Sequence, residues 1–157
     1  MGRYPGAPGS EGRRLAEFSV LARSETVSRL RRAPEGCENW RPDADAMSFA
    51  DLAQHVMDSD RWLLHVLTGT RPGDAAGKSG LARPKNYVEY LHLLEELRDS
   101  GGRRKTTLES MTDEQVNGLI PDQSLGKVSV WWAVLANIGH EAHHGGQVSV
   151  YLRMIRR

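Results

Sequence analysis

Apolar residues recur at helical spacing over most of the chain, separated by short segments that hold the helix breakers. From Ser10 to about Arg32 this pattern predicts a first helix. Ser48-Phe49-Ala50-Asp51 has the form of a capping box, so a second helix is predicted to begin there and to stop before Gly69. The segment between these helices is predicted to be a loop, whose Trp40 closes one edge of the core.

A third helix is predicted from about Asn86, with Ser100-Gly101-Gly102 weakening or ending it. Residues 106–118 fit either the tail of this helix or a further short one. The segment Ser129–Met154 is the longest apolar-periodic stretch and predicts the last core helix. No useful period-two run and no internal repeat are seen. The sequence therefore predicts an all-α fold, an up-and-down bundle of about four main helices.

The chain has 157 residues, of which 39% are hydrophobic, and this is enough for one domain with a real core. Residues 13–157 are predicted to form that domain. Residues 1–12 are rich in Gly and Pro and are expected to be a flexible tail. A second stretch, Gly73–Pro84, has few large side chains and is predicted to be an exposed connection.

Charge and hydropathy argue against several classes of function. The 21 Lys and Arg residues balance the 20 Asp and Glu residues, so the chain has no bulk field for nucleic acid or an anionic membrane. No apolar run reaches the ~20 residues of a membrane helix, and the N-terminus lacks the apolar region of a signal peptide. The single Cys37 suits a reducing compartment. We therefore expect a cytoplasmic protein without nucleic-acid or membrane partners.

Histidine is the residue type that carries the chemical signal. Three of the six His residues fall within His140-Glu141-Ala142-His143-His144. At ~100° per residue, His140 and His144 lie about 40° apart and one turn apart along the axis, so both imidazoles can bind one ion. Two buried imidazoles would otherwise each need a polar partner, which favours metal ligation. His143 lies about 60° from His140 on the other side, so spacing alone leaves a His140 and His143 pair open.

A metal site of this kind needs a third ligand, because catalytic zinc sites have three protein ligands and an open position for water. His55 is the best candidate, since it lies inside the second helix between Leu52 and Val56, where an imidazole needs an explanation. We expect a divalent metal ion, zinc or nickel first, with manganese or iron as further options. His65 and His92 are expected to be ordinary boundary or surface residues.

The same run also matches the H-E-x-x-H pattern of zinc proteases, in which Glu141 would be the general base. Such enzymes take a third ligand downstream, whereas residues 145–157 contain no His, Asp or Glu. A metalloprotease is therefore the least favoured interpretation. Glu141, and Asp58 one turn beyond His55, are weak catalytic candidates for proton transfer, because both are expected to be solvated helix carboxylates.

Trp62, Trp131 and Trp132 are the aromatic residues that would suit an apolar substrate pocket. Aromatic residues at helical spacing more often fill a core or a dimer interface, so we predict that these three belong to the core. No Gly-rich phosphate loop and no serine or cysteine nucleophile constellation is seen, so nucleotide chemistry lacks support.

Several motifs together resemble the DinB/YfiT-like family, and they are Trp40 with Pro42, Ser48 to His55, Trp62, and His140 to Gln147. Members of this family are four-helix bundles with one His on the second helix and His-x-x-x-His on the last. The resemblance therefore implies His55, His140 and His144 as the metal ligands, and it selects His144 over His143. It also implies a homodimer.

The resemblance further implies a range of activities rather than one. Characterised relatives include metal-dependent transferases and isomerases that use low-molecular-weight thiols. The family commonly has a basic residue at the position of Gly145, which this chain lacks, whereas Gln147 matches. The leading hypothesis is a metal-dependent, thiol-dependent transferase or a hydrolase that acts on a small molecule. The alternatives are a metal-binding stress-response protein without catalysis and a bundle with structural histidines.

Overall fold

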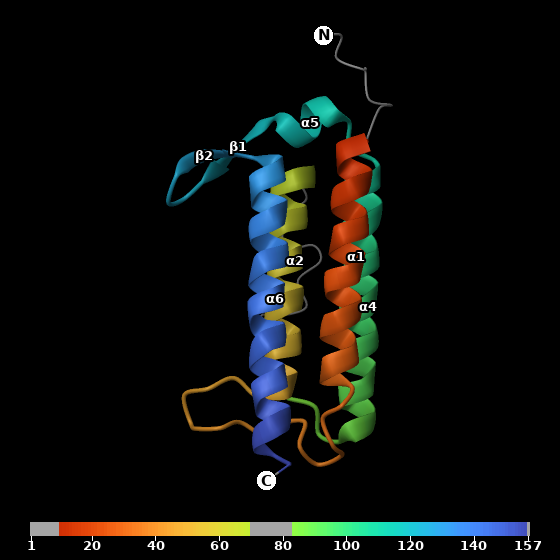
Figure 1. Cartoon of the computed structure of the whole chain (residues 1–157), viewed down its shortest axis with the longest axis vertical. Helices are drawn as coiled ribbons and strands as arrows, with labels where there is room; N and C mark the ends of the chain where they lie inside the picture. The colour runs from red at the N-terminus through yellow and green to blue at the C-terminus, as the bar shows by residue number, and fades with distance from the viewer. Residues whose placement is uncertain (1–9, 70–82, 157) are drawn as a thin grey trace.

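Four long helices form the body of the protein, which the computed structural model describes over residues 10–69 and 83–156. They are α1 (Ser10–Leu30), α2 (Phe49–Thr68), α4 (Tyr87–Glu109) and α6 (Val130–Met154). A short helix α5 (Asp113–Asn117) and a hairpin of β1 (Leu119–Asp122) with β2 (Gly126–Ser129) connect α4 to α6 at one end (Figure 1). The predicted all-α bundle is confirmed.

The directions of the helices differ from a simple up-and-down order. Figure 1 shows α1 and α6 running one way and α2 and α4 running the other way. A helix as long as α2 spans about 30 Å, and α4 begins at the same end of the bundle as α2, so these two helices are parallel (Figure 1). Hydrophobic periodicity describes which face of a helix is buried and carries no information on direction, so the sequence did not reveal this order.

Local signals set the helix ends. Ser48 caps α2, with its side chain accepting from the Asp51 backbone N–H while the Asp51 carboxylate accepts from the Ser48 backbone N–H. Gly69 closes the same helix with a φ of 70°, which a residue without a Cβ adopts freely. Ser129 caps α6, with its side chain accepting from the Trp132 backbone N–H. These boundaries agree with the predicted ones.

Two buried clusters of apolar residues make up the core, one toward each end of the bundle. Trp40 packs against the cluster that contains Phe49 and Tyr151, with ring centroids 6.2 Å and 5.6 Å from theirs. The predicted role of Trp40 at the edge of the core is therefore confirmed. None of the described helices is long and apolar enough to cross a membrane.

Three expectations about secondary structure need correction. Helix α4 continues through Ser100, Gly101 and Gly102 to Glu109, because packing against neighbouring helices overrides the low helix propensity of glycine. The segment expected to lack strands contains the hairpin, whose four-residue strands are too short to show a period of two. Helix α1 begins at Ser10, as the apolar spacing predicted, so residues 10–12 belong to this helix and not to the expected tail; residues 1–9 and most of Gly73–Pro84 lie outside the described residues.

Candidate metal centre

Three histidines from two helices meet between α2 and α6. The Nε2 atom of His140 lies 3.0 Å from Nε2 of His55 and 3.0 Å from Nε2 of His144. One ligand nitrogen from each ring lies within 4.8 Å of the other two, and the ring centroids are 4.4–4.8 Å apart. The structure thus brings together the three residues that the sequence singled out, and it places His144 rather than His143 in the cluster.

The antiparallel packing of α2 on α6 creates this meeting point. Ser59 lies one turn beyond His55 along α2, and its Oγ accepts a hydrogen bond from the Asn137 amide of α6 at 2.8 Å. This hydrogen bond and the contact of His55 with His140 belong to the same antiparallel register, because residue numbers that increase along α2 face residue numbers that decrease along α6. His140 and His144 lie one turn apart on α6, so both rings reach the level of His55.

Hydrogen bonding alone leaves the cluster incompletely satisfied. The Gln147 amide oxygen accepts from Nδ1–H of His144 at 2.6 Å, an assignment that leaves the lone pair of His144 Nε2 directed into the cluster. Nε2 of His140 faces two imidazole nitrogens at once, although it offers only one proton or one lone pair. Nδ1 of His140 is buried and has no hydrogen-bond partner among the described residues.

A divalent metal ion fits this donor set. Three neutral imidazoles with converging lone pairs are ligands that zinc and similar metals accept, with Zn–N bonds of about 2.0–2.1 Å. Such bonds at tetrahedral angles place ligand nitrogens roughly 3.3 Å apart, close to the 3.0 Å contacts of His140. One ion would accept all three lone pairs. No assignment of protons to the three rings gives every one of these nitrogens a hydrogen bond.

The environment keeps His140 and His144 uncharged. Burial lowers the pKa of His140 below its ordinary value, and the nearby His144 and His55 lower it further. Burial also lowers the pKa of His144, against the opposing effect of its hydrogen bond to Gln147. Both rings are therefore neutral at pH 7, the protonation state that metal binding requires.

A cavity of about 270 Å³ lies directly beside His55. It runs between α2 and the loop that precedes it, and it is lined by Arg41, Asp45, Ala46, Met47, Asp51, Gln54, His55 and Asp58. A larger hollow of about 630 Å³ between α1 and α4 contains none of the three clustered histidines. Of the three clustered histidines, His55 is the one that lines the smaller cavity, so this cavity brings solvent next to one side of the candidate metal centre.

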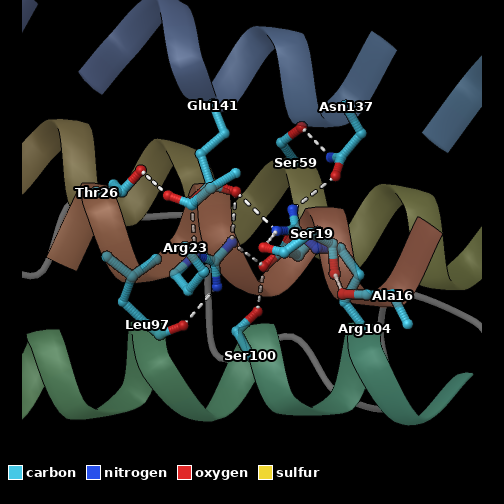
Figure 2. Close-up of polar contacts among 12 residues, drawn as sticks. Ala16, Ser19, Arg23, Thr26, Ser59, Leu97, Ser100, Arg104, Asn137 and Glu141 are labelled. Atoms are coloured by element: carbon cyan, nitrogen blue, oxygen red, sulfur yellow. Dashed lines mark hydrogen bonds and ion pairs between the residues drawn. The ribbon is translucent and has the colours of Figure 1, made fainter. Parts of the chain in front are cut away.

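A network of four buried charges joins all four long helices next to the histidine cluster (Figure 2). Figure 2 shows Glu141 reaching from α6 toward Arg23 of α1 and Arg104 of α4. Arg23 Nε donates to one Glu141 oxygen at 2.7 Å, and Arg104 Nη2 lies 2.9 Å from the other. Asp60 of α2 accepts from both guanidinium groups, at 2.7 Å and 2.9 Å. Two positive and two negative charges are thus paired in the interior.

Glu141 is a member of this network and not the solvated carboxylate that we expected. Its side chain is only 1% exposed. Burial by itself would raise the pKa of Glu141, but the hydrogen bond from Arg23 and the charges of Arg23 and Arg104 hold it below its usual range. Both carboxylate oxygens accept from guanidinium groups, so the arrangement ties α6 to α1 and α4 instead of presenting a base to the histidines.

Asp58 is the weak catalytic candidate that does lie near the cluster. It lines the cavity beside His55 and is partly exposed. One of its oxygens accepts from Gln54 at 3.0 Å and from Arg61 at 2.9 Å. His143 is exposed, with its ring centroid 5.2 Å from that of His144.

Sequence reasoning missed Arg23, Asp60 and Arg104, and it misplaced the tryptophans. Each of the three charged residues occupies a buried position within an apolar-periodic helix, and that unusual placement was the available signal. Trp62, Trp131 and Trp132 are 45%, 42% and 45% exposed, so the prediction that they belong to the core is wrong. They lie at helix positions that face away from the bundle interior.

Fold and site together define an all-helical bundle with a three-histidine candidate metal centre between α2 and α6. The sequence profile of the DinB superfamily matches residues 20–148, and the chain belongs to this superfamily. Among solved structures it is similar to a DinB-like protein, YjoA, from Bacillus subtilis, with a TM-score of 0.70 and 19% sequence identity over 92% of each chain. At this identity the likeness concerns the fold. No curated protein matches the chain.

Proposed function

We propose that this chain is a cytoplasmic, divalent-metal-dependent enzyme that acts on a small molecule, as a thiol-dependent transferase or a hydrolase. In this proposal His55, His140 and His144 hold the metal ion, zinc or nickel, and leave a coordination position open toward the cavity. The observation that carries the proposal is the convergence of three imidazole nitrogens that hydrogen bonding leaves unsatisfied.

The residues around the cluster support such chemistry. A bound divalent metal ion lowers the pKa of a coordinated water to about 7 and deprotonates a coordinated thiol. Gln147 orients the His144 ring through the bond to Nδ1. Asp58 lies on the wall of the same cavity, and its Oδ2 accepts no hydrogen bond from the described residues, so it is the group that we propose to take up the proton.

Metal content is the first test. Elemental analysis of the purified protein is expected to find about one metal ion per chain, and chelation is expected to lower the melting temperature. His55→Ala and His144→Ala should lose the metal, whereas His92→Ala, which alters an exposed His on α4, should keep it. Protein without stoichiometric metal, with melting unchanged by chelation, would contradict the site.

Catalysis is tested separately. The metal-loaded protein is incubated with electrophiles and several cellular thiols, and the rate of conjugate formation is compared with that of His144→Ala. A rate that depends on both the thiol and His144 is expected. Equal rates in a protein that contains metal would instead favour the metal-binding protein without catalysis.

A further inference from the structure

Two exposed tryptophans, Trp62 on α2 and Trp132 on α6, have no role in the core. Each is 45% exposed, and neither belongs to the two buried clusters of apolar residues. A half-exposed Trp leaves a large apolar surface in water, which favours contact with another apolar group. Their positions relative to the histidine cluster indicate what that group is.

The register of α2 on α6 places the two tryptophans at the same level. His55 meets His140 at 3.0 Å, and Ser59 meets Asn137 at 2.8 Å, so residue numbers that face each other across these antiparallel helices sum to about the same value. Trp62 is therefore level with Trp132, to within about one residue. At 1.5 Å per residue, both lie roughly 10–12 Å along the helix axes from the histidine cluster.

Trp62 leaves α2 on the side that carries His55, and Trp132 leaves α6 on the solvent side of His140. At ~100° per residue, Trp62 lies about 20° from His55 around α2, and Trp132 lies about 80° from His140 around α6. On each helix this rotation is directed away from the buried face, which Leu63 on α2 and Glu141 on α6 mark on the other side of the His. The two rings therefore lie on the outer side of the α2 and α6 pair.

Trp131 provides a contrast within the same helix. It is 42% exposed, almost the same as its neighbour Trp132, but it lines a hollow with Leu15 and Phe18 of α1. Successive helix residues point about 100° apart, so Trp131 serves the α1 side and Trp132 the α2 side. Only Trp62 and Trp132 share a face with the histidine cluster.

We propose that Trp62 and Trp132 bind the aromatic or alkyl part of the small molecule whose reactive end reaches the histidine cluster. This inference rests on the proposed function and specifies its substrate class, a molecule with its apolar group roughly 10 Å from the atom that meets the metal. Two half-exposed Trp side chains offer roughly 200 Å² of surface. A stable protein partner needs about 800 Å² on each side, so a small ligand fits this area better than a second copy of the chain.

Hydroxamates of different length test the inference, because the hydroxamate group chelates a metal ion and carries a chosen tail. The metal-loaded protein is titrated calorimetrically with acetohydroxamate and octanohydroxamate. The long chain is expected to bind at least tenfold more tightly, through burial of its methylene groups. Trp62→Ala and Trp132→Ala should each remove most of this gain while leaving the Kd of acetohydroxamate unchanged. Trp131→Ala and Trp132→Phe should keep it.

The possible results distinguish a failure of the metal centre from a failure of the tryptophan site. Binding of neither hydroxamate would overturn the metal centre and, with it, this inference. Equal affinities of the short and long hydroxamates, or equal losses in Trp131→Ala and Trp132→Ala, would overturn the inference alone. Sedimentation of the same variants tests whether a second copy of the chain covers these tryptophans instead. If Trp132→Ala converts a dimer to a monomer and still binds the long hydroxamate more tightly than the short one, this surface belongs to an interface between copies.

Discussion

A histidine in this protein has a role that its immediate partners define. His92 is exposed on α4, and His143 is exposed one residue before a member of the cluster. His140, by contrast, has Nε2 between two other imidazoles, and its buried Nδ1 has no hydrogen-bond partner in the part of the chain that the structure describes. The same side chain is thus an ordinary surface group at two positions, where water can satisfy its nitrogens, and a ligand candidate at a third, where a nitrogen is buried away from water.

The pH dependence of metal affinity follows from these residues. Burial and neighbouring imidazoles place the pKa values of His140 and His144 below the ordinary value of about 6.5, so both remain neutral to a lower pH than a free His. Metal affinity should be nearly constant above pH 6.5 and fall as the pH drops below it. Competition titrations with a chromogenic chelator measure this. A midpoint above pH 6.5 would contradict the prediction.

The stability of the apo protein should also decrease as the pH falls below 6.5. The unfolded chain takes up protons at these two positions at a higher pH than the folded chain, so their contribution is present above pH 6.5 and decreases below it. Urea titrations of the apo protein at several pH values check this direction.

At the scale of the element, α4 depends on the small size of one glycine. A Cβ on Gly101 would lie 2.8 Å from Cγ and 2.9 Å from Nη1 of Arg23, and Arg23 cannot yield because Leu97, Asp60 and Glu141 hold its guanidinium. Gly101→Ala should lower the free energy of unfolding by about 1–3 kcal/mol. Gly102→Ala meets open space and should leave it unchanged or raise it by up to about 1 kcal/mol.

Urea denaturation of the two alanine variants gives the comparison directly, since the substitutions are chemically identical and one residue apart. Equal effects of both variants would show that helix propensity, rather than the space around Arg23, determines the stability of this segment.

Helix α6 is joined to α1 and α4 by the buried carboxylate of Glu141, and removal of its charge should destabilise the fold. Glu141→Gln leaves Arg23 and Arg104 without part of their compensation in the interior, which should cost about 3–5 kcal/mol of stability. Asp58→Asn removes a partly exposed ion pair with Arg61 and should cost less than about 1 kcal/mol. Chemical denaturation curves distinguish the two. A similar small loss for both would mean that the network is not needed for stability.

At the scale of the whole molecule, the surface of α6 is unusual in exposing no Asp, Glu, Lys or Arg before Arg153, its second-last residue. Between Val130 and Leu152 its only Asp, Glu, Lys or Arg is the buried Glu141. The adjoining surface of α1 exposes Phe18 (51%) and Leu21 (65%). A helix of this length spans about 37 Å, so the two helices together offer an area comparable to one side of a stable interface. We therefore propose that the chain forms a homodimer through the α1 and α6 face.

Two glutamate substitutions test the homodimer. Leu21→Glu on α1 should convert the dimer to a monomer, because it places a charge in an apolar interface. Val88→Glu on α4 alters a side chain of almost the same exposure, 64% against 65%, and should leave the dimer intact. Equilibrium sedimentation of the wild type and both variants measures the mass. A monomeric wild type would contradict the proposal.

Much of this architecture follows from the sequence alone. A helix forms through bonds between residues four apart and ends at local caps, so apolar spacing and residues such as Ser48 and Gly69 predict it without knowledge of the fold. The pairing of His140 with His144 is equally local, because one turn of helix separates them. His55 was identified as a polar residue within an apolar stretch.

The tertiary structure decided the rest. Whether a helix runs up or down, and which neighbour it faces, depends on contacts between residues far apart in the chain. For this reason the sequence did not show that Arg23, Asp60, Arg104 and Glu141 share one buried network, or that Trp62 and Trp132 face water on the side of the cluster. The three histidines could be selected from spacing and resemblance, but only the packing of α2 against α6 brings one nitrogen of each ring to within 4.8 Å of the other two.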